Sequence, residues 1–152
     1  MLRHVLMVIV IIGSLFNVAN ASENIKVNKV VWLTTTQAMS SGLDNARKEA
    51  GAASFHPFAV DQSKLILTHF QSTFPAKLNK EPESVKMAYL QKNVTPYLKA
   101  YSPELLRSQL GISLAKLYQV TRIPAVVIND HYIAYGVSVK EAIDAFNQAT
   151  AK

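Results

Sequence analysis

Short runs of apolar residues alternate with helix-like patterns along the first half of the chain. Residues 27–34 are rich in β-branched and aromatic side chains, and Val30 to Leu33 form an unbroken apolar run, which predicts a strand buried on both faces. Residues 35–41 are polar and predict a loop, and residues 43–52 predict a helix with its apolar positions on one side. Residues 55–61 predict a second strand, at a sheet edge because Pro57 lacks the N–H that a central strand donates.

Four prolines punctuate the middle of the chain, at positions 75, 82, 96 and 103. Helices are expected around residues 64–70 and over residues 83–93, followed by a longer helix to Tyr118. Ser102 is the expected cap of that longer helix, with Pro103 at its first position. Gly111 costs the helix up to about 1 kcal/mol unless close packing requires it. The expected apolar face comprises Leu105, Leu106, Leu110, Leu114, Leu117 and Tyr118.

The last third of the chain carries the clearest local signals. Residues 125–128 predict a short buried strand, Asn129 and Asp130 a two-residue turn, and residues 131–135 the return strand. Ser138 and Glu141 have the spacing of a capping box and predict the start of a closing helix. The order of elements predicts an α/β fold with a mixed four-stranded sheet flanked by helices. Its first two strands are expected to be parallel because a helix connects them.

The first 21 residues have the pattern of a secretory signal peptide. Arg3 precedes an apolar run from Val5 to Ile12, and the segment ends in Ala19-Asn20-Ala21. Cleavage is expected after Ala21, which leaves residues 22–152 as one exported domain. An uncleaved membrane anchor is the alternative, although the stretch is short for a helix that needs about 20 apolar residues. Without its leader, the chain is expected to have no transmembrane segment.

Cysteine is absent from the 152 residues, which excludes disulfides, thiol redox chemistry and cysteine-ligated metal sites. His56, His69 and His131 lack the spacing of metal ligands, and no glycine-rich phosphate loop occurs. The sequence therefore predicts neither a metal nor a cofactor. The net charge of +6 includes lysines 77, 80, 86, 92 and 99 in the middle segment. Glutamates interrupt this group, so a solvated face is favoured over a specific nucleic-acid site.

The segment Arg122-Ile123-Pro124-Ala125-Val126-Val127-Ile128, followed by Gly136 and a final helix, resembles the thioredoxin fold. The resemblance implies a cis bond between Ile123 and Pro124, and a helical insertion before the strand that follows. More closely, the chain resembles a family of exported thioredoxin-like proteins encoded on integrating conjugative elements. Residues 123–128 together with residues 133–137 carry this likeness. It implies a periplasmic location and a role in a conjugative transfer apparatus of the type IV secretion class.

The chain departs from redox thioredoxins where they carry two cysteines, after the first strand. Residues 34–41 stand there and hold only Thr, Gln, Ala, Met and Ser, so disulfide exchange by this chain is excluded. We therefore expect a protein–protein interaction module that binds other envelope proteins and has no catalytic residues. An extended peptide can pair with free backbone groups at the end of a sheet. The expected binding surface comprises Thr35, Thr36, Gln37, Arg122, Ile123 and Pro124.

Two other functions stay open at the level of sequence. One is an enzyme with non-thiol chemistry that uses Thr36, Ser40 or His56, which requires a nucleophile and a base within hydrogen-bond reach. The other is a non-specific binder of DNA or membrane surfaces, which would lose affinity steeply as salt rises. The identity of the partner and the oligomeric state are left open.

Overall fold

The computed structural model describes residues 25–151, and the predicted signal peptide and its cleavage site lie outside this range. The expected mixed sheet is present, with four strands in the order β2-β1-β3-β4. They are β1 (Lys29–Thr34), β2 (Ser54–Ala59), β3 (Ala125–Ile128) and β4 (Tyr132–Tyr135). β1 pairs in parallel with β2 and antiparallel with β3, and β3 pairs antiparallel with β4. The parallel pair and the terminal hairpin are both as predicted.

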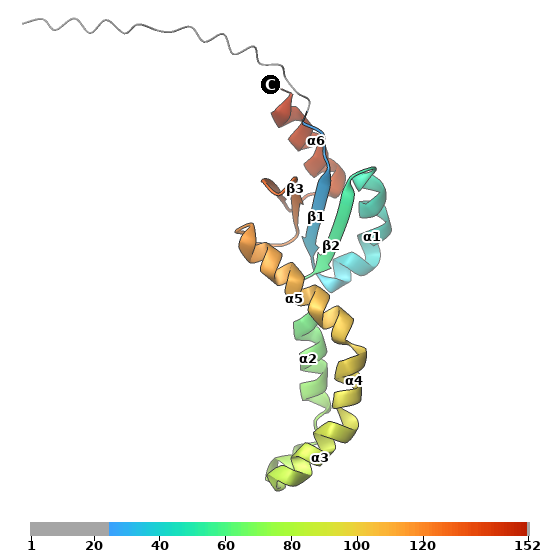
Figure 1. Ribbon diagram of the computed structural model, residues 1–152, viewed down its shortest axis with the longest axis vertical. Helices are drawn as coiled ribbons and strands as arrows, with labels where there is room; N and C mark the ends of the chain where they lie inside the picture. Colours follow the sequence, from blue (N-terminus) through green and yellow to red (C-terminus); the bar gives the residue numbers. More distant parts are fainter. Residues whose placement is uncertain (1–24, 152) are drawn as a thin grey trace, which may run out of the picture.

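Helices cover both faces of the sheet (Figure 1). On one face, α1 (Thr36–Ala50) and α6 (Val139–Thr150) pack over a core built around Trp32, Val126 and Phe146. On the other face, the last turns of α5 (Ser102–Leu117) cover Leu33 and Val127. The strands β1 and β3 lie in the middle and are almost completely buried, as their unbroken apolar runs predict.

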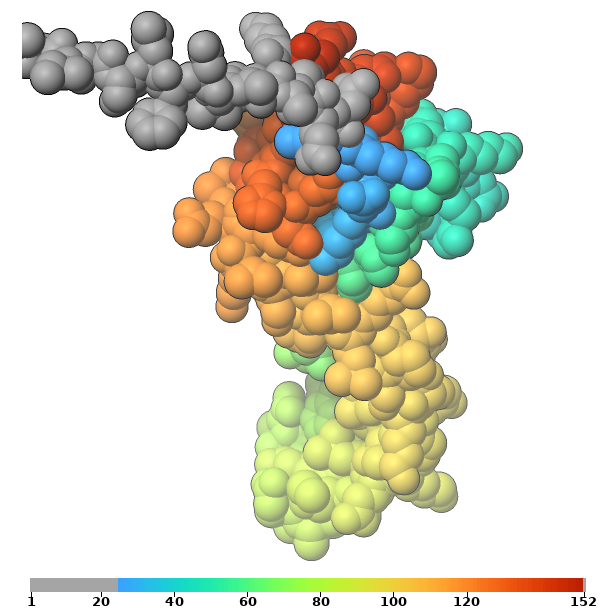
Figure 2. Space-filling model, turned by 45° about the horizontal axis from the view of Figure 1, so that its top comes forward, coloured from blue at the N-terminus to red at the C-terminus, as the bar shows by residue number. Residues whose placement is uncertain are grey.

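The middle of the chain forms a helical arm that extends away from the sheet (Figure 1). It comprises α2 (Gln62–Thr73), a 3₁₀ turn η1 (Ala76–Lys80), α3 (Glu83–Asn93) and α4 (Thr95–Ala100). The bounds of α3 are those predicted, whereas α2 is longer than expected and α4 was not foreseen. In the space-filling view the arm forms a lobe below the sheet and its covering helices (Figure 2).

Several local predictions are confirmed. The capping box of α6 has both of its hydrogen bonds, between Ser138 and Glu141. Asn129 and Asp130 both have positive φ, as a two-residue hairpin turn of this kind requires. The Ile123–Pro124 bond is cis. Gly111 lies where α5 meets β2, and an added Cβ would stand 2.6 Å from the Cβ of Phe58, so close packing does require glycine there.

Three sequence-based predictions are wrong. Residues 35–41 are not a loop: α1 begins at Thr36 because the Thr35 hydroxyl caps it by accepting from the Ala38 N–H at 3.2 Å. Ser102 is not a cap but the first residue of α5, and its hydroxyl donates to the Leu98 carbonyl of α4. The leucines of α5 do not form one buried face, because Leu106, Leu110 and Leu117 point into solvent.

Candidate interaction site

The structure brings the two predicted groups of site residues to the same end of the sheet. Thr35, Thr36 and Gln37 follow β1 directly, and Arg122, Ile123 and Pro124 directly precede β3. The antiparallel register pairs Leu33 with Ala125, so the chain continues from that pair to Thr34 on one strand and Pro124 on the other. Segments that are 85 or more residues apart in sequence therefore meet at one end of the sheet, as expected.

At this end of the sheet, Thr36 is held by hydrogen bonds to Asp61, a residue that the sequence analysis did not single out. The Asp61 carboxylate, at the start of α2, accepts from the Thr36 N–H at 2.7 Å and from the Thr36 hydroxyl at 2.8 Å. It thereby satisfies an N–H of the first turn of α1 that has no partner within the helix. The one signal in the sequence for this role of Asp61 was its position between a predicted strand and a predicted helix. Gln37 is exposed, and its carbonyl accepts from the Ser40 hydroxyl.

The segment before β3 is open to solvent. Arg122, Ile123 and Pro124 are all exposed, and the Arg122 guanidinium lies 5.0 Å from the centre of the Tyr135 ring, in cation–π range. The Pro124 carbonyl accepts from the Gly136 N–H at 3.0 Å and so extends the ladder with β4. Among the residues that the structure describes, no hydrogen bond uses the backbone of Arg122 or Ile123. Their N–H and C=O groups are therefore available to a partner.

A charged cluster lies at the opposite end of the same strands. The Lys29 ammonium is 2.8 Å from the Asp130 carboxylate, which also accepts from the Tyr118 hydroxyl. The hydrogen bond from Lys29 lowers the pKa of Asp130, and the same bond raises the pKa of Lys29. Burial, and then the hydrogen bond to Asp130, raise the pKa of the Tyr118 hydroxyl. The cluster joins β1, the end of α5 and the β3–β4 turn, which is a structural role.

The residues considered for enzymatic or metal chemistry are spread over the molecule. His56 Nε2 lies 2.8 Å from the Ser54 hydroxyl on the exposed edge strand β2, and the Ser40 hydroxyl donates to a backbone carbonyl. His131 Nδ1 lies 2.7 Å from the Asn129 carbonyl. Over residues 25–151, no three His, Asp or Glu side chains are grouped so that they could hold a metal ion. In the same range, no helix combines the length and apolar character needed to cross a membrane.

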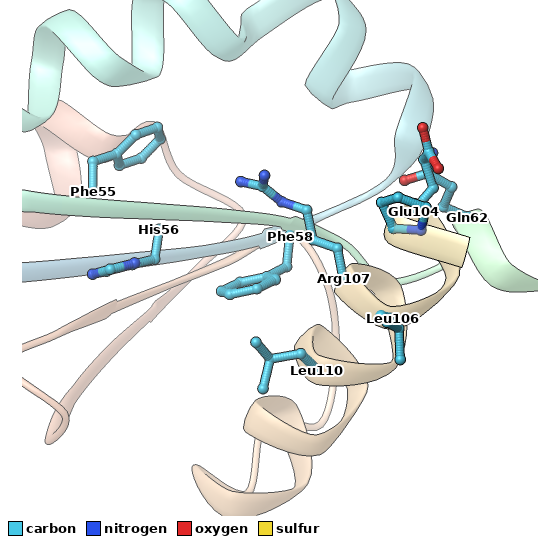
Figure 3. A pocket seen from close by; sticks show the side chains of 9 residues that line it. Phe55, His56, Phe58, Gln62, Glu104, Leu106, Arg107 and Leu110 are labelled. Carbon is cyan, nitrogen blue, oxygen red and sulfur yellow. The ribbon is translucent and has the colours of Figure 1, made fainter. Parts of the chain in front are cut away.

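A hollow of about 580 Å³, which the sequence did not reveal, lies between β2 and α5 (Figure 3). Phe55, Phe58, Leu106 and Leu110 are among its lining residues. Arg107 reaches from α5 to the exposed edge of β2 and donates to the Pro57 carbonyl at 3.2 Å. This bond occupies an outward-facing group of the edge strand, and Pro57 itself has no N–H to offer.

Comparison with known proteins identifies a family. Residues 42–151 match the sequence model of DUF1525, which is described as a protein of unknown function. No curated protein and no solved structure matches the chain.

Proposed function

We propose that this chain, which belongs to the DUF1525 family, is a non-enzymatic protein–protein interaction module of the periplasm with a thioredoxin-like fold. The assignment to this fold rests on the strand order β2-β1-β3-β4, with a parallel first pair, a terminal hairpin and helices on both faces. The likeness of residues 123–137 to exported proteins of conjugative elements supports a role in a conjugative transfer apparatus of the type IV secretion class.

One observation carries the interaction proposal: the open backbone of Arg122 and Ile123 beside the start of α1. An extended segment of a partner can pair with these N–H and C=O groups and add a short strand at the end of the sheet. The Arg122 guanidinium and the side chains of Thr36 and Gln37 supply contacts to the side chains of the partner segment. Ile123, with 37% of its surface exposed, offers an apolar anchor at the centre of the site.

The enzyme alternative has one geometric feature in its favour, the Thr36 hydroxyl within hydrogen-bond reach of the Asp61 carboxylate. The same carboxylate oxygen also accepts the Thr36 N–H, which makes it a fixed part of the helix start. A general base must instead be free to take the proton of a nucleophile. We therefore favour binding over catalysis at this edge.

The test is DNA transfer from donor cells in which a variant replaces the chain. Ile123→Asp puts a charge at the centre of the open segment and should lower the transfer frequency by at least tenfold. Lys48→Asp, on the exposed side of α1, is the matched control and should transfer normally. Equal amounts of both variants in the cell envelope show that each is stable. Normal transfer by the Ile123→Asp variant contradicts the proposed site.

A further inference from the structure

The helix α5 carries leucines on two opposite sides, and the sheet covers only one of them. Gly111, Leu114 and Ala115 face the sheet. On the outer side, Leu106, Leu110 and Leu117 have 71%, 52% and 70% of their surface exposed. Ser113 is exposed between Leu110 and Leu117. Side chains as apolar as leucine, repeated along one outward stripe, are typical of a helix that pairs with another helix.

The spacing of this stripe fits helix pairing. Positions 106, 110, 113 and 117 are separated by four, three and four residues, which is the alternation of the two seam positions of a coiled coil. Arg107 and Leu114 border the seam on one side, and Gln109 and Lys116 border it on the other. All of these residues belong to one continuous helix, so the stripe runs straight along it.

We propose that α5 pairs antiparallel with α5 of a second copy of this chain. The two-fold axis passes near Gly111 and Ile112, so that Leu106 faces Leu117 of the second copy, and Leu110 faces its Ser113. The small Ser113 lets the helices approach closely at the centre, and its hydroxyl already donates to the Gln109 carbonyl at 2.9 Å.

The two ends of the stripe complement each other in shape. At the N-terminal end, Leu106 and Leu110 border the hollow that Phe55 and Phe58 also line (Figure 3). At the C-terminal end, Leu117 projects into solvent. An antiparallel two-fold arrangement brings the projecting Leu117 of each copy to the hollow of the other, so one surface serves as both partners.

The charges that border the seam are compatible with a second copy in this orientation. In an antiparallel pair, the bordering positions of one side meet the same side of the other helix. Arg107 therefore faces Leu114 of the second copy, and Lys116 faces its Gln109. No like charges are opposed, and the guanidinium of Arg107 remains bonded to the Pro57 carbonyl of its own chain.

The first test is the mass of the purified protein in solution, after expression of the full chain, by analytical ultracentrifugation from low to high micromolar concentrations. We expect twice the monomer mass at the upper end of this range. Leu110→Lys and Leu117→Lys should each return the mass to that of a monomer with an unchanged circular dichroism spectrum. Leu67→Lys, at a leucine of α2 that is 49% exposed, is the matched control and should remain dimeric.

The second test uses the absence of native cysteine. Ser113→Cys should form a covalent dimer with a short bis-maleimide, whereas Ser72→Cys, on the exposed surface of the arm, should not. A monomeric wild-type protein at every concentration overturns the proposal and leaves the stripe to a different partner. A dimer that persists in both lysine variants of α5 also overturns it. Neither outcome bears on Ile123 or on DNA transfer, so the proposed function is tested separately.

Discussion

The body of the molecule, which comprises the sheet with α1, α5 and α6, and the helical arm differ in packing and in charge. In the body, Val30, Leu33 and Val126 are completely buried, whereas α3 and α4 contain no buried residue. Residues 62–100 carry six lysines against two glutamates, a net charge of +4. Residues 25–61 and 101–151 carry eight basic and seven acidic side chains, a net charge of +1. One chain thus combines a well-packed, nearly neutral body with an open, basic arm.

The N-terminal caps of the helices also differ between the body and the arm. In the body, the side chains of Thr35 and Ser138 cap α1 and α6, whereas α5, which begins where the arm ends, has no side-chain cap. The described helices of the arm, α2, α3 and α4, have no side-chain hydrogen bond at their N-caps. Stability and positioning of the candidate site therefore come from the body, and the arm depends on α5, which its helix α2 packs against.

Truncation of one leucine in each region should give the largest difference in stability between the body and the arm. Leu33→Ala opens a cavity in the fully buried core between β1 and α5 and should lower the free energy of unfolding by about 2–5 kcal/mol. Leu67→Ala, at a leucine of the arm that is 49% exposed, should cost less than about 1 kcal/mol. Urea denaturation measures both values. Similar losses for the two variants would show that the arm is packed as tightly as the body.

Two glycines test how closely helices approach the body's core. Gly111→Ala should lower the free energy of unfolding by about 1–3 kcal/mol, because the new Cβ would stand 2.6 Å from Phe58. Gly42→Ala, in α1, should instead stabilise by up to about 1 kcal/mol, since its Cβ would meet Trp32 at an ordinary 3.5 Å. Thermal denaturation of both variants gives the sign of each change. A stabilising Gly111→Ala would contradict the close approach of α5 to β2.

Removal of a helix cap should have a smaller effect, confined to the body. Ser138→Ala removes the hydroxyl that accepts from the Glu141 N–H and donates to the Glu141 carboxylate, and it should cost about 1 kcal/mol. Ser84→Ala is the control on the arm, at an exposed serine in the first turn of α3 whose side chain caps nothing. It should change the free energy of unfolding by less than about 0.5 kcal/mol. Equal costs at both serines would mean that capping does not distinguish the regions.

The smallest effect is the pH dependence of the Lys29–Asp130–Tyr118 cluster. The pKa of Asp130 is lowered, so its contribution is present above the ordinary carboxyl pKa and is lost as the pH falls through the folded value. The pKa values of Lys29 and Tyr118 are raised, so their contributions are lost as the pH rises through the alkaline range. Because the Lys29 and Asp130 side chains are 38% and 44% exposed, the pair contributes less than about 1 kcal/mol.

Asp130→Asn checks this assignment. The variant should be less stable than wild type near neutral pH, and this difference should disappear at both ends of the pH range. Denaturation midpoints at acidic, neutral and alkaline pH provide the comparison. A difference that stays constant across the range would assign the stabilisation to something other than these charges.

Local signals explain which parts of the fold were predictable. The buried strands, the Asn129–Asp130 turn and the capping box of Ser138 each depend on neighbouring residues, so the sequence was sufficient. The start of α1 was missed because residues 35–41 are polar, and neither the local Thr35 cap nor the support from Asp61, 25 residues away, appears in a hydrophobic pattern. The exposed leucines of α5 were missed because a helix that is apolar on both sides does not indicate which side meets the sheet.

The candidate site shows the same division. The sequence indicated two separate segments with suitable chemistry, Thr35, Thr36 and Gln37 in one and Arg122, Ile123 and Pro124 in the other. Their position at one edge depended on the pairing of Leu33 with Ala125, for which the resemblance to thioredoxins was the guide. The hollow between β2 and α5 had no signal of its own, because it depends on how two distant elements are spaced.

The central claim is that the chain binds a partner at the sheet end marked by Ile123. Its most direct test is photo-crosslinking in donor cells, with a photoreactive residue placed either at Ile123 or at Lys48. We predict that the Ile123 position captures a defined envelope protein, that the Lys48 position does not, and that Arg122→Glu strongly reduces the capture. Equal capture from the two positions, or no capture from Ile123 in cells that transfer DNA normally, would contradict it.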